Sequence, residues 1–192
     1  MEKLGGRFSR IKNLHKYFFL QEICSNFESR SVTVKYYLTV EETLVILKPS
    51  AIGRGIAGEI ITRFERKGLI IAGMKMIQLN DALLDEHYAH LVDRPFFPRI
   101  KASMMSTPVV VMCVKGKDAV QVVRNMTGVT NGRNANPGTI RGDYSMSGQE
   151  NIVHASDSVE NGKIELARFF KPEEIFDYTP TGLNYLYASD EI

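Results

Sequence analysis

The stretch Thr43-Leu-Val-Ile-Leu47 opens the regular pattern of this 192-residue sequence and indicates its fold. Its side chains are apolar or β-branched, which predicts a strand buried on both faces, and Lys48-Pro49 ends that strand. Apolar residues then recur at helical spacing between residues 56 and 64, and Gly68 supplies a stop. The pattern therefore begins with a buried strand followed by an amphipathic helix.

Strands and helices continue to alternate after this unit. Residues 69 to 79 and 107 to 114 predict the second and third strands, with two short helical pieces between them. A helix from 118 to 128, a short fourth strand at Ile152-Val153 and a closing helix over about 159 to 170 complete the chain. The order βαββαβ predicts the ferredoxin-like fold of the α+β class, a single domain with a four-stranded antiparallel sheet and helices on one face.

The segment Gly53-Arg-Gly-Ile-Ala-Gly58 has the glycine spacing of a P-loop. Glu59-Ile60 stands where that motif needs Lys and Ser or Thr, so a P-loop is rejected. The expected role is a tight turn, with Gly58 allowing close packing at the helix start. Gly162 lies inside the closing helix, where glycine costs about 1 kcal/mol relative to alanine.

Charge is distributed unevenly along the chain. Residues 1–40 hold seven basic and three acidic side chains, a balance of +4, which leaves −2 for residues 41–192 of the net +2. The first forty residues show no apolar period, so we expect an N-terminal extension of unknown role before one domain over residues 41–192. That domain lacks a general positive field, and nucleic acid is not expected as its primary ligand.

The longest apolar run, Val109 to Val114, is far shorter than the ~18 residues of a membrane span. Cys24 and Cys113 fall in different contexts, which argues against a disulfide framework. We therefore expect no membrane partner and a location in the reducing cytoplasm.

The segment Asn151-Ile-Val-His154-Ala-Ser-Asp-Ser158 holds the strongest candidate for a reactive group. His154 follows a short apolar run and precedes residue types that cap a helix N-terminus, so its imidazole is expected beside free backbone amides. Such a junction suits phosphate chemistry. A packed core histidine is the ordinary alternative, and a Ser-His-Asp hydrolase is poorly supported because Ser156 and Asp157 are sequence neighbours.

Other residues offer groups for a phosphate site. Arg141, in Pro137-Gly-Thr-Ile-Arg-Gly-Asp143, could converge with Lys48 and Arg124 around His154 to hold a polyphosphate. Phe96 could stack on a base, although an aromatic residue between prolines more often has a packing role.

His87 and His90 lie three residues apart on a predicted helix. This spacing could bring two imidazoles to one metal ion, but the sequence offers no evident third ligand. Surface or packing roles are expected for both.

Over residues 43–187 the chain resembles the nucleoside diphosphate kinase family. The order and spacing of the matching segments agree with the family as well as their residues do. The segments are Leu47-Lys48-Pro49, Gly55-Ile-Ala-Gly-Glu-Ile60, Arg63-Phe-Glu-Arg-Lys-Gly68, Glu86-His-Tyr88, Asp93-Arg-Pro-Phe-Phe97, Pro137-Gly-Thr-Ile-Arg-Gly-Asp143 and Asn151-Ile-Val-His-Ala-Ser-Asp-Ser158.

The resemblance implies transfer of the γ-phosphoryl group of ATP or another nucleoside triphosphate to a nucleoside diphosphate, in two steps through a phosphohistidine. His154 would be the nucleophile, while Glu165, hydrogen-bonded to Ser156, would accept a bond from its other ring nitrogen. Lys48 would bind the ribose 3′-hydroxyl and the terminal phosphate. The other residues that the resemblance assigns to the nucleotide are Tyr88, Arg124, Thr130 and Arg141 for phosphates, Asn151 for ribose, and Phe96 and Ile100 for the base.

The resemblance also implies Mg²⁺ as cofactor, bound mainly through nucleotide phosphates and not at a separate protein site. It implies a tetramer or hexamer of identical chains. Because the implied contacts address phosphate and sugar, we expect activity on several nucleotides.

Three positions depart from the residues usual in the family. Gly148 stands where valine commonly forms the second wall against the base, so an altered base affinity is expected. Ala155 and Glu150 replace a common glycine and a frequent basic residue, but neither removes a group that the chemistry uses. A regulatory or nucleic-acid-binding protein is the rival function, and phosphorylation of protein histidines is a further possible activity. The first rival is disfavoured because every implied catalytic position holds the expected residue type.

Overall fold

The computed structural model describes residues 40–191. Val40–Tyr187 form one compact unit, and Ala188–Glu191 lie outside it. Apart from Val40, the predicted N-terminal extension falls outside the described residues. None of the described helices is long and apolar enough to cross a membrane.

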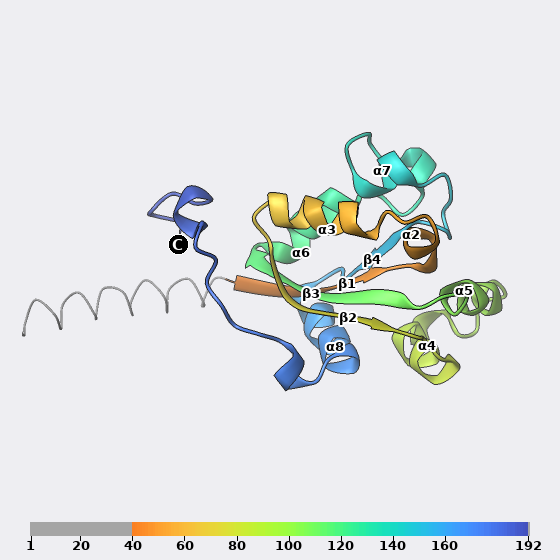
Figure 1. Ribbon diagram of the computed structural model, residues 1–192. Helices are drawn as coiled ribbons and strands as arrows, with labels where there is room; N and C mark the ends of the chain where they lie inside the picture. Colours follow the sequence, from red (N-terminus) through yellow and green to blue (C-terminus); the bar gives the residue numbers. More distant parts are fainter. Residues whose placement is uncertain (1–39, 192) are drawn as a thin grey trace, which may run out of the picture. The chain divides into compact units, whose positions relative to one another are not determined.

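Four strands form one antiparallel sheet in the order β2-β3-β1-β4 (Figure 1). This order confirms the predicted ferredoxin-like fold. The strands are β1 (Val40–Leu47), β2 (Ile70–Ile77), β3 (Val109–Lys117) and β4 (Val153–Ala155).

Strand β1 begins three residues earlier than the apolar pattern predicts. Glu41 and Glu42 pair with Gly116 and Lys115 of β3, and a Glu42 carboxylate oxygen lies 2.7 Å from Lys115 Nζ. Such a cross-strand charge pair stabilises a polar strand end that hydrophobicity alone does not mark.

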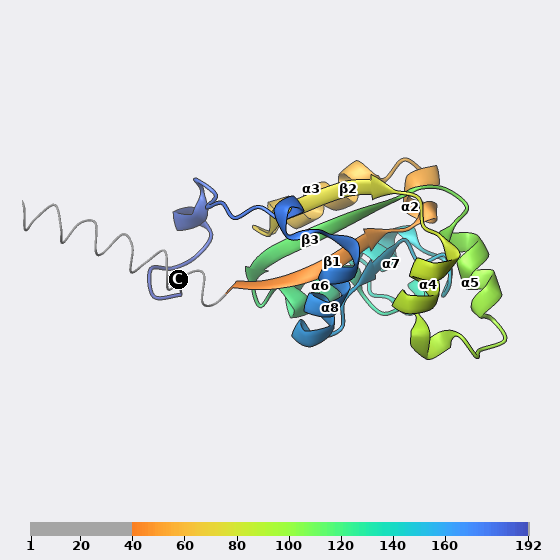
Figure 2. The ribbon, with the colours of Figure 1, turned by 90° about the horizontal axis from the view of Figure 1, so that it is seen from below.

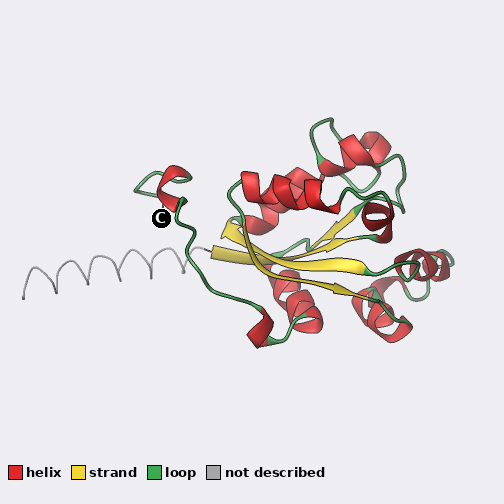
Figure 3. Cartoon of the chain, viewed as in Figure 1, coloured by secondary structure: helices red, strands yellow, loops and turns green. Residues whose placement is uncertain are grey.

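Seven α-helices and four short 3₁₀ turns connect and cover the strands in the described part of the chain (Figure 3). The helices are α2 (Pro49–Gly53), α3 (Ala57–Arg66), α4 (Asp81–His87), α5 (Phe97–Met104), α6 (Ala119–Thr127), α7 (Ile140–Tyr144) and α8 (Val159–Phe169). The turns are η1 (Ala89–Leu91), η2 (Gly132–Asn134), η3 (Pro172–Glu174) and η4 (Leu183–Tyr185). The long loop after α6 is thus not featureless, since it contains η2 and α7.

Helices cover both faces of the sheet, so the prediction of helices on one face is wrong. Leu44 and Ile46 of β1 pack into a core with α4, α5 and α8, while Val45 and Leu47 pack into a second core with α3 and α6. Figure 2 shows α8 and α4 in front of the strands and α3 behind them. The prediction that β1 is buried on both faces is confirmed, and it requires this two-sided cover.

Glycines allow a close backbone contact and a turn. A Cβ atom on Gly162 of α8 would lie 2.8 Å from the carbonyl oxygen of Glu42, so this glycine lets α8 approach β1. Gly55 has a φ of 67°, which confirms the predicted tight turn. A Cβ on Gly58 would meet no atom within 4 Å, so the predicted close packing there is wrong.

We predict that Gly162→Ala lowers the free energy of unfolding by about 1 to 3 kcal/mol, because overpacking against a backbone oxygen outweighs the better helix propensity of alanine. Gly58→Ala is the matched control and should raise it by about 0.4 to 1 kcal/mol, since the site has room. Urea unfolding at one protein concentration measures both variants. A Gly162→Ala protein as stable as wild type would contradict the close-approach explanation.

Candidate functional site

A pocket of about 930 Å³ lies between the α4–α5 region, the loop around α7, the end of β4 and helix α8. Its lining includes both cationic and aromatic side chains from segments far apart in the sequence. Of the site residues expected from the sequence, it is lined by Lys48, Tyr88, Phe96, Ile100, Arg124, Thr130, Arg141, Asn151, His154 and Glu165. The remaining one, Ser156, is buried behind Glu165.

A tight turn at Ile152 places His154 at the pocket. Ile152 is buried and has a φ of 73°, an unusual value for a β-branched residue. The N–H of Val153 donates to the carbonyl of Asn151 at 2.8 Å, and the N–H of Lys48 donates to the carbonyl of Ile152 at 2.9 Å. This strained connection lets Asn151 and His154 both reach the pocket from neighbouring positions.

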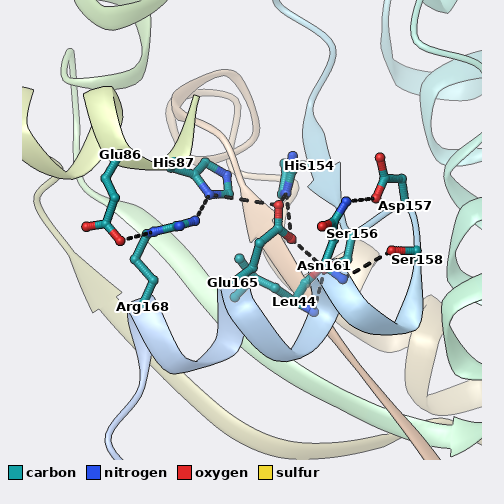
Figure 4. A network of polar contacts seen from close by, with 10 residues as sticks. All are labelled: Leu44, Glu86, His87, His154, Ser156, Asp157, Ser158, Asn161, Glu165 and Arg168. Atoms are coloured by element: carbon teal, nitrogen blue, oxygen red, sulfur yellow. Dashed lines mark hydrogen bonds and ion pairs between the residues drawn. The ribbon is translucent and has the colours of Figure 1, made fainter. Parts of the chain in front are cut away.

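The imidazole of His154 is oriented by Glu165 (Figure 4). Its Nε2 atom lies 3.2 and 3.3 Å from the two carboxylate oxygens of Glu165. Ser156 Oγ donates to Glu165 Oε2 at 2.5 Å and accepts from the N–H of Leu44 at 3.1 Å. The carboxylate is therefore tied to the central strand as well as to the histidine.

Glu165 is a carboxylate at neutral pH. Burial acts to raise its pKa, but hydrogen bonds from His154 and Ser156 outweigh burial and lower the pKa below its usual value. An anionic acceptor requires a proton on Nε2 of His154, which leaves the lone pair on Nδ1. Figure 4 shows that this second ring nitrogen points away from Glu165.

The helix that follows is capped as the sequence indicates. Ser158 Oγ accepts from the N–H of Asn161 at 3.1 Å, and Asn161 also donates to Asp157 Oδ1 at 2.6 Å. These contacts fix the start of α8, and two turns later this helix carries Glu165 to the histidine.

Lys48 and Arg141 bring buried positive charge to the pocket. Lys48 Nζ donates to Asn151 Oδ1 at 2.7 Å. Burial, assisted by the charge of Arg141, lowers the pKa of Lys48 to about 8. Burial and the nearby Arg124 lower the pKa of Arg141 to about 10. An anion bound between these groups would relieve their mutual repulsion.

Arg141 also organises the surrounding backbone. Its guanidinium donates to the carbonyls of Gly128 at 2.6 Å, Val153 at 2.7 Å and Asn151 at 3.3 Å. The amide of Asn151 donates to the carbonyls of Thr130 and Gly148 at 3.1 and 2.8 Å. These bonds hold the α6–β4 connection in place through contacts within the protein.

Two hydroxyl groups extend this polar surface. Tyr88 is buried with its ring centroid 6.2 Å from that of His154, and burial raises its pKa, so the phenol stays neutral. Thr130 lies on the loop after α6 and is exposed, as is Arg124 on α6 itself. Arg124 and Thr130 supply donors to the pocket from α6 and the loop after it.

The outer part of the pocket has one aromatic wall. Phe96, 43% exposed, and Ile100 stand at the start of α5. The facing segment contains Gly148, where an added Cβ would meet no atom within 4 Å. Arg99 Nε donates to Gln149 Oε1 at 2.7 Å and closes the outer edge. A flat ring could enter this slot beside Phe96.

The sequence did not indicate that His87 and Arg168 belong to the surroundings of His154. His87, for which a surface or packing role is expected, is buried against His154, whereas His90 is exposed. Arg168 of α8 lines the same pocket and lies three residues after Glu165. That spacing places both on one helix face and is the signal that could have identified Arg168.

His87, His154 and Glu165 offer nitrogen and oxygen atoms within 4.8 Å of one another, a set that could hold a metal ion. The guanidinium of Arg168 lies 3.4 Å from His87 Nδ1, and Glu165 already accepts from His154 and Ser156. A cation beside the set and an occupied carboxylate favour a hydrogen-bonded cluster over a metal centre.

The family model for nucleoside diphosphate kinase matches residues 41–175. A nucleoside diphosphate kinase of Parabacteroides distasonis is 64% identical over 152 residues, which cover 79% of this chain and 99% of that protein. One of Pyrococcus horikoshii is 49% identical over 150 residues, 77% of this chain and 95% of that protein. The structure of the nucleoside diphosphate kinase of Halobacterium salinarum in complex with CDP aligns with a TM-score of 0.75 at 38% identity, covering 77% of this chain and 99% of that chain.

Fold, pocket and sequence agree with one enzyme class. The match extends over nearly the whole length of these relatives, and the segment from β1 to η3 that it covers supplies every pocket residue named above. The chain therefore belongs to the nucleoside diphosphate kinase family and transfers the γ-phosphoryl group of a nucleoside triphosphate to a nucleoside diphosphate.

Proposed function

We propose that His154 is the residue that is phosphorylated, and that Nδ1 is the attacking atom. The observation that carries this proposal is the bond between Nε2 and Glu165, because it commits one ring nitrogen as a donor and leaves a lone pair on the other. Nδ1 forms a bond to the γ-phosphorus while the bond from phosphorus to the bridging oxygen breaks, and the nucleoside diphosphate leaves. The second half-reaction reverses these bond changes with another diphosphate.

Lys48, Arg124 and Arg141 are proposed to hold the phosphates, with the hydroxyls of Tyr88 and Thr130 as further donors. Positioning and charge stabilisation are the main contributions to phosphoryl transfer, and these cations converge on the pocket of His154. Lys48 is proposed to contact the terminal phosphate and the ribose 3′-hydroxyl.

Phe96 and Ile100 are proposed to hold the base, with Asn151 supporting the sugar. The complex of the Halobacterium salinarum relative with CDP supports a nucleoside diphosphate as ligand. Since the proposed contacts use the base face and leave its edges largely unread, we propose activity on several nucleotides.

Mg²⁺ is proposed as cofactor, held mainly by the nucleotide phosphates, where it would neutralise part of their charge. The three pocket carboxylates are already engaged: Glu86 with Arg168, Asp157 with Asn161 and Glu165 with His154. The residues present therefore fit an ion that arrives with its nucleotide.

We further propose a tetramer or hexamer that acts in the cytoplasm. Met74 and Met76 on the edge strand β2 are 55% and 59% exposed and offer an apolar surface for subunit contact. Residues 41–192 are proposed as the kinase domain, and residues 1–40 as an N-terminal extension of unknown role.

Incubation with γ-labelled ATP and no acceptor should place an acid-labile label on wild-type protein that chases into a triphosphate when a nucleoside diphosphate is added. His154→Ala should take up no label, because the attacking nitrogen is gone. His90→Ala removes an exposed imidazole at the same pocket and should label normally. Labelling of His154→Ala at the wild-type level would refute the proposed nucleophile.

Nucleotide binding near pH 8 should take up about half a proton per site, because Lys48 with a pKa of about 8 is half neutral when free and a bound phosphate raises that pKa. Calorimetry in two buffers with different ionisation enthalpies measures the uptake. Lys48→Arg stays charged and should show almost none. Equal uptake by this variant would assign the proton to another group.

Gly148→Val should lower the dissociation constant of the nucleotide, because the valine side chain would bury apolar surface against the base. Each buried methylene group contributes about 0.8 kcal/mol, which corresponds to up to about fourfold in the dissociation constant. The added side chain has room, since no atom lies within 4 Å of the Cβ position. Gly182→Val, at an equally open position outside the pocket lining, is the control. Unchanged dissociation constants for Gly148→Val would show that this segment does not face the base.

A further inference from the structure

His87 lies against the proposed nucleophile but has no part in the roles proposed above. It is the last residue of α4, and its side chain is 1% exposed. The centroid of its ring lies 4.7 Å from that of His154, 4.6 Å from that of Tyr88 and 5.1 Å from that of Phe169. The imidazole is therefore fixed as a wall on one side of His154.

Two imidazoles face the same carboxylate oxygen in this cluster (Figure 4). Oε1 of Glu165 lies 3.2 Å from His154 Nε2 and 3.9 Å from His87 Nδ1. This 3.9 Å distance is too long for a hydrogen bond, but with a proton on Nδ1 His87 would become a second donor to that oxygen after a shift of the carboxylate toward it. It would compete with His154 and weaken the bond that keeps the Nδ1 lone pair of His154 free.

Arg168 opposes this competition. Its Nη1 atom lies 3.4 Å from His87 Nδ1, closer than the carboxylate oxygen. A guanidinium can only donate, so a hydrogen bond at this contact requires Nδ1 to accept and places the proton of the neutral ring on Nε2, which is buried and has no hydrogen-bond partner among the described residues. Glu86 holds the guanidinium in place, since its Oε1 accepts from Arg168 Nε at 2.7 Å.

The surroundings also keep His87 uncharged, so its ring carries a single N–H proton, on either Nδ1 or Nε2. Burial lowers the pKa of His87 to about 3, with His154, Arg168 and His90 acting in the same direction and Glu165 acting against them. The titratable and charged groups around this ring are His154 on β4, Glu165 and Arg168 on α8, and Glu86, Tyr88 and His90 at and after the end of α4.

We propose that Arg168 is a positioning residue that acts through His87: by occupying Nδ1 of His87 it reserves Oε1 of Glu165 for His154. This inference rests on the proposed role of His154 as nucleophile. It predicts that loss of the guanidinium changes the tautomer of His87 and slows phosphorylation of His154, while nucleotide binding is unaffected.

The test compares full-length wild type with Arg168→Met, Arg168→Lys and Lys163→Met. Methionine keeps the length but cannot donate, lysine can still donate to Nδ1, and Lys163 is an exposed cation of the same helix outside the pocket lining. Long-range ¹H–¹⁵N NMR spectra give the histidine tautomers, and the His87→Gln spectrum identifies the signals of His87. The rate of label transfer from γ-labelled ATP to the protein gives the chemical step, and its dependence on ATP concentration gives the binding.

Wild type and Lys163→Met should show His87 with its proton on Nε2 and equal rates. Arg168→Met should move that proton to Nδ1 and slow labelling about tenfold at an unchanged half-saturating ATP concentration, the size of effect found for outer partners that orient a functional histidine. Arg168→Lys should restore the wild-type tautomer and most of the rate.

A wild-type His87 with its proton on Nδ1 would overturn the inference. So would an Arg168→Met protein with the wild-type tautomer, or one that changes tautomer at an unchanged rate. Failure of wild type to label His154 at all would refute the proposed nucleophile and is distinguishable, because the tautomer of His87 is measured without turnover.

Discussion

Positive charge that is crowded into one partly buried pocket is the constraint on which the site depends. Lys48 and Arg141 are so desolvated and so close to like charge that the pKa of each lies below its usual value. Asn151 offsets this repulsion, because its side-chain oxygen accepts a hydrogen bond from Lys48 and its carbonyl accepts one from Arg141. The carbonyl of Ile152 accepts from the backbone N–H of Lys48 and so holds the chain that carries this cation. The same hydrogen bonds hold the strained backbone of Ile152 in place, and this backbone in turn directs Asn151 and His154 to the pocket.

The proposed nucleophile, His154, depends on a second, linear arrangement. The N–H of Leu44, the hydroxyl of Ser156, the carboxylate of Glu165 and the imidazole of His154 follow one another from the central strand to the pocket. Strands β1 and β4 and helix α8 each supply a member, so the reactive tautomer is a property of the assembled domain. Gly162 contributes indirectly, because the close contact between α8 and β1 sets where Glu165 can reach.

Most of the fold and the pocket could be predicted from the sequence, because apolar periodicity marks the strands and the resemblance marks the polar residues. The apolar and β-branched strand at residues 43–47 already requires helices on both faces of the sheet, whereas the order of the elements led to the prediction of helices on one face. The contrasting roles of Gly58 and Gly162 could not be predicted, since what a Cβ would meet depends on segments distant in sequence. His87 is packed and His90 is exposed, as expected, but the contact of His87 with His154 could not be predicted because it depends on how the fold places α4 beside β4.

Arg141 donates three hydrogen bonds to backbone carbonyls, those of Gly128, Asn151 and Val153. These bonds join the two ends of the connection between α6 and β4, so contacts within the protein restrict its conformations and reduce the entropy that nucleotide binding can cost. An enzyme that must release one nucleotide and accept another in every cycle gains from this rigidity.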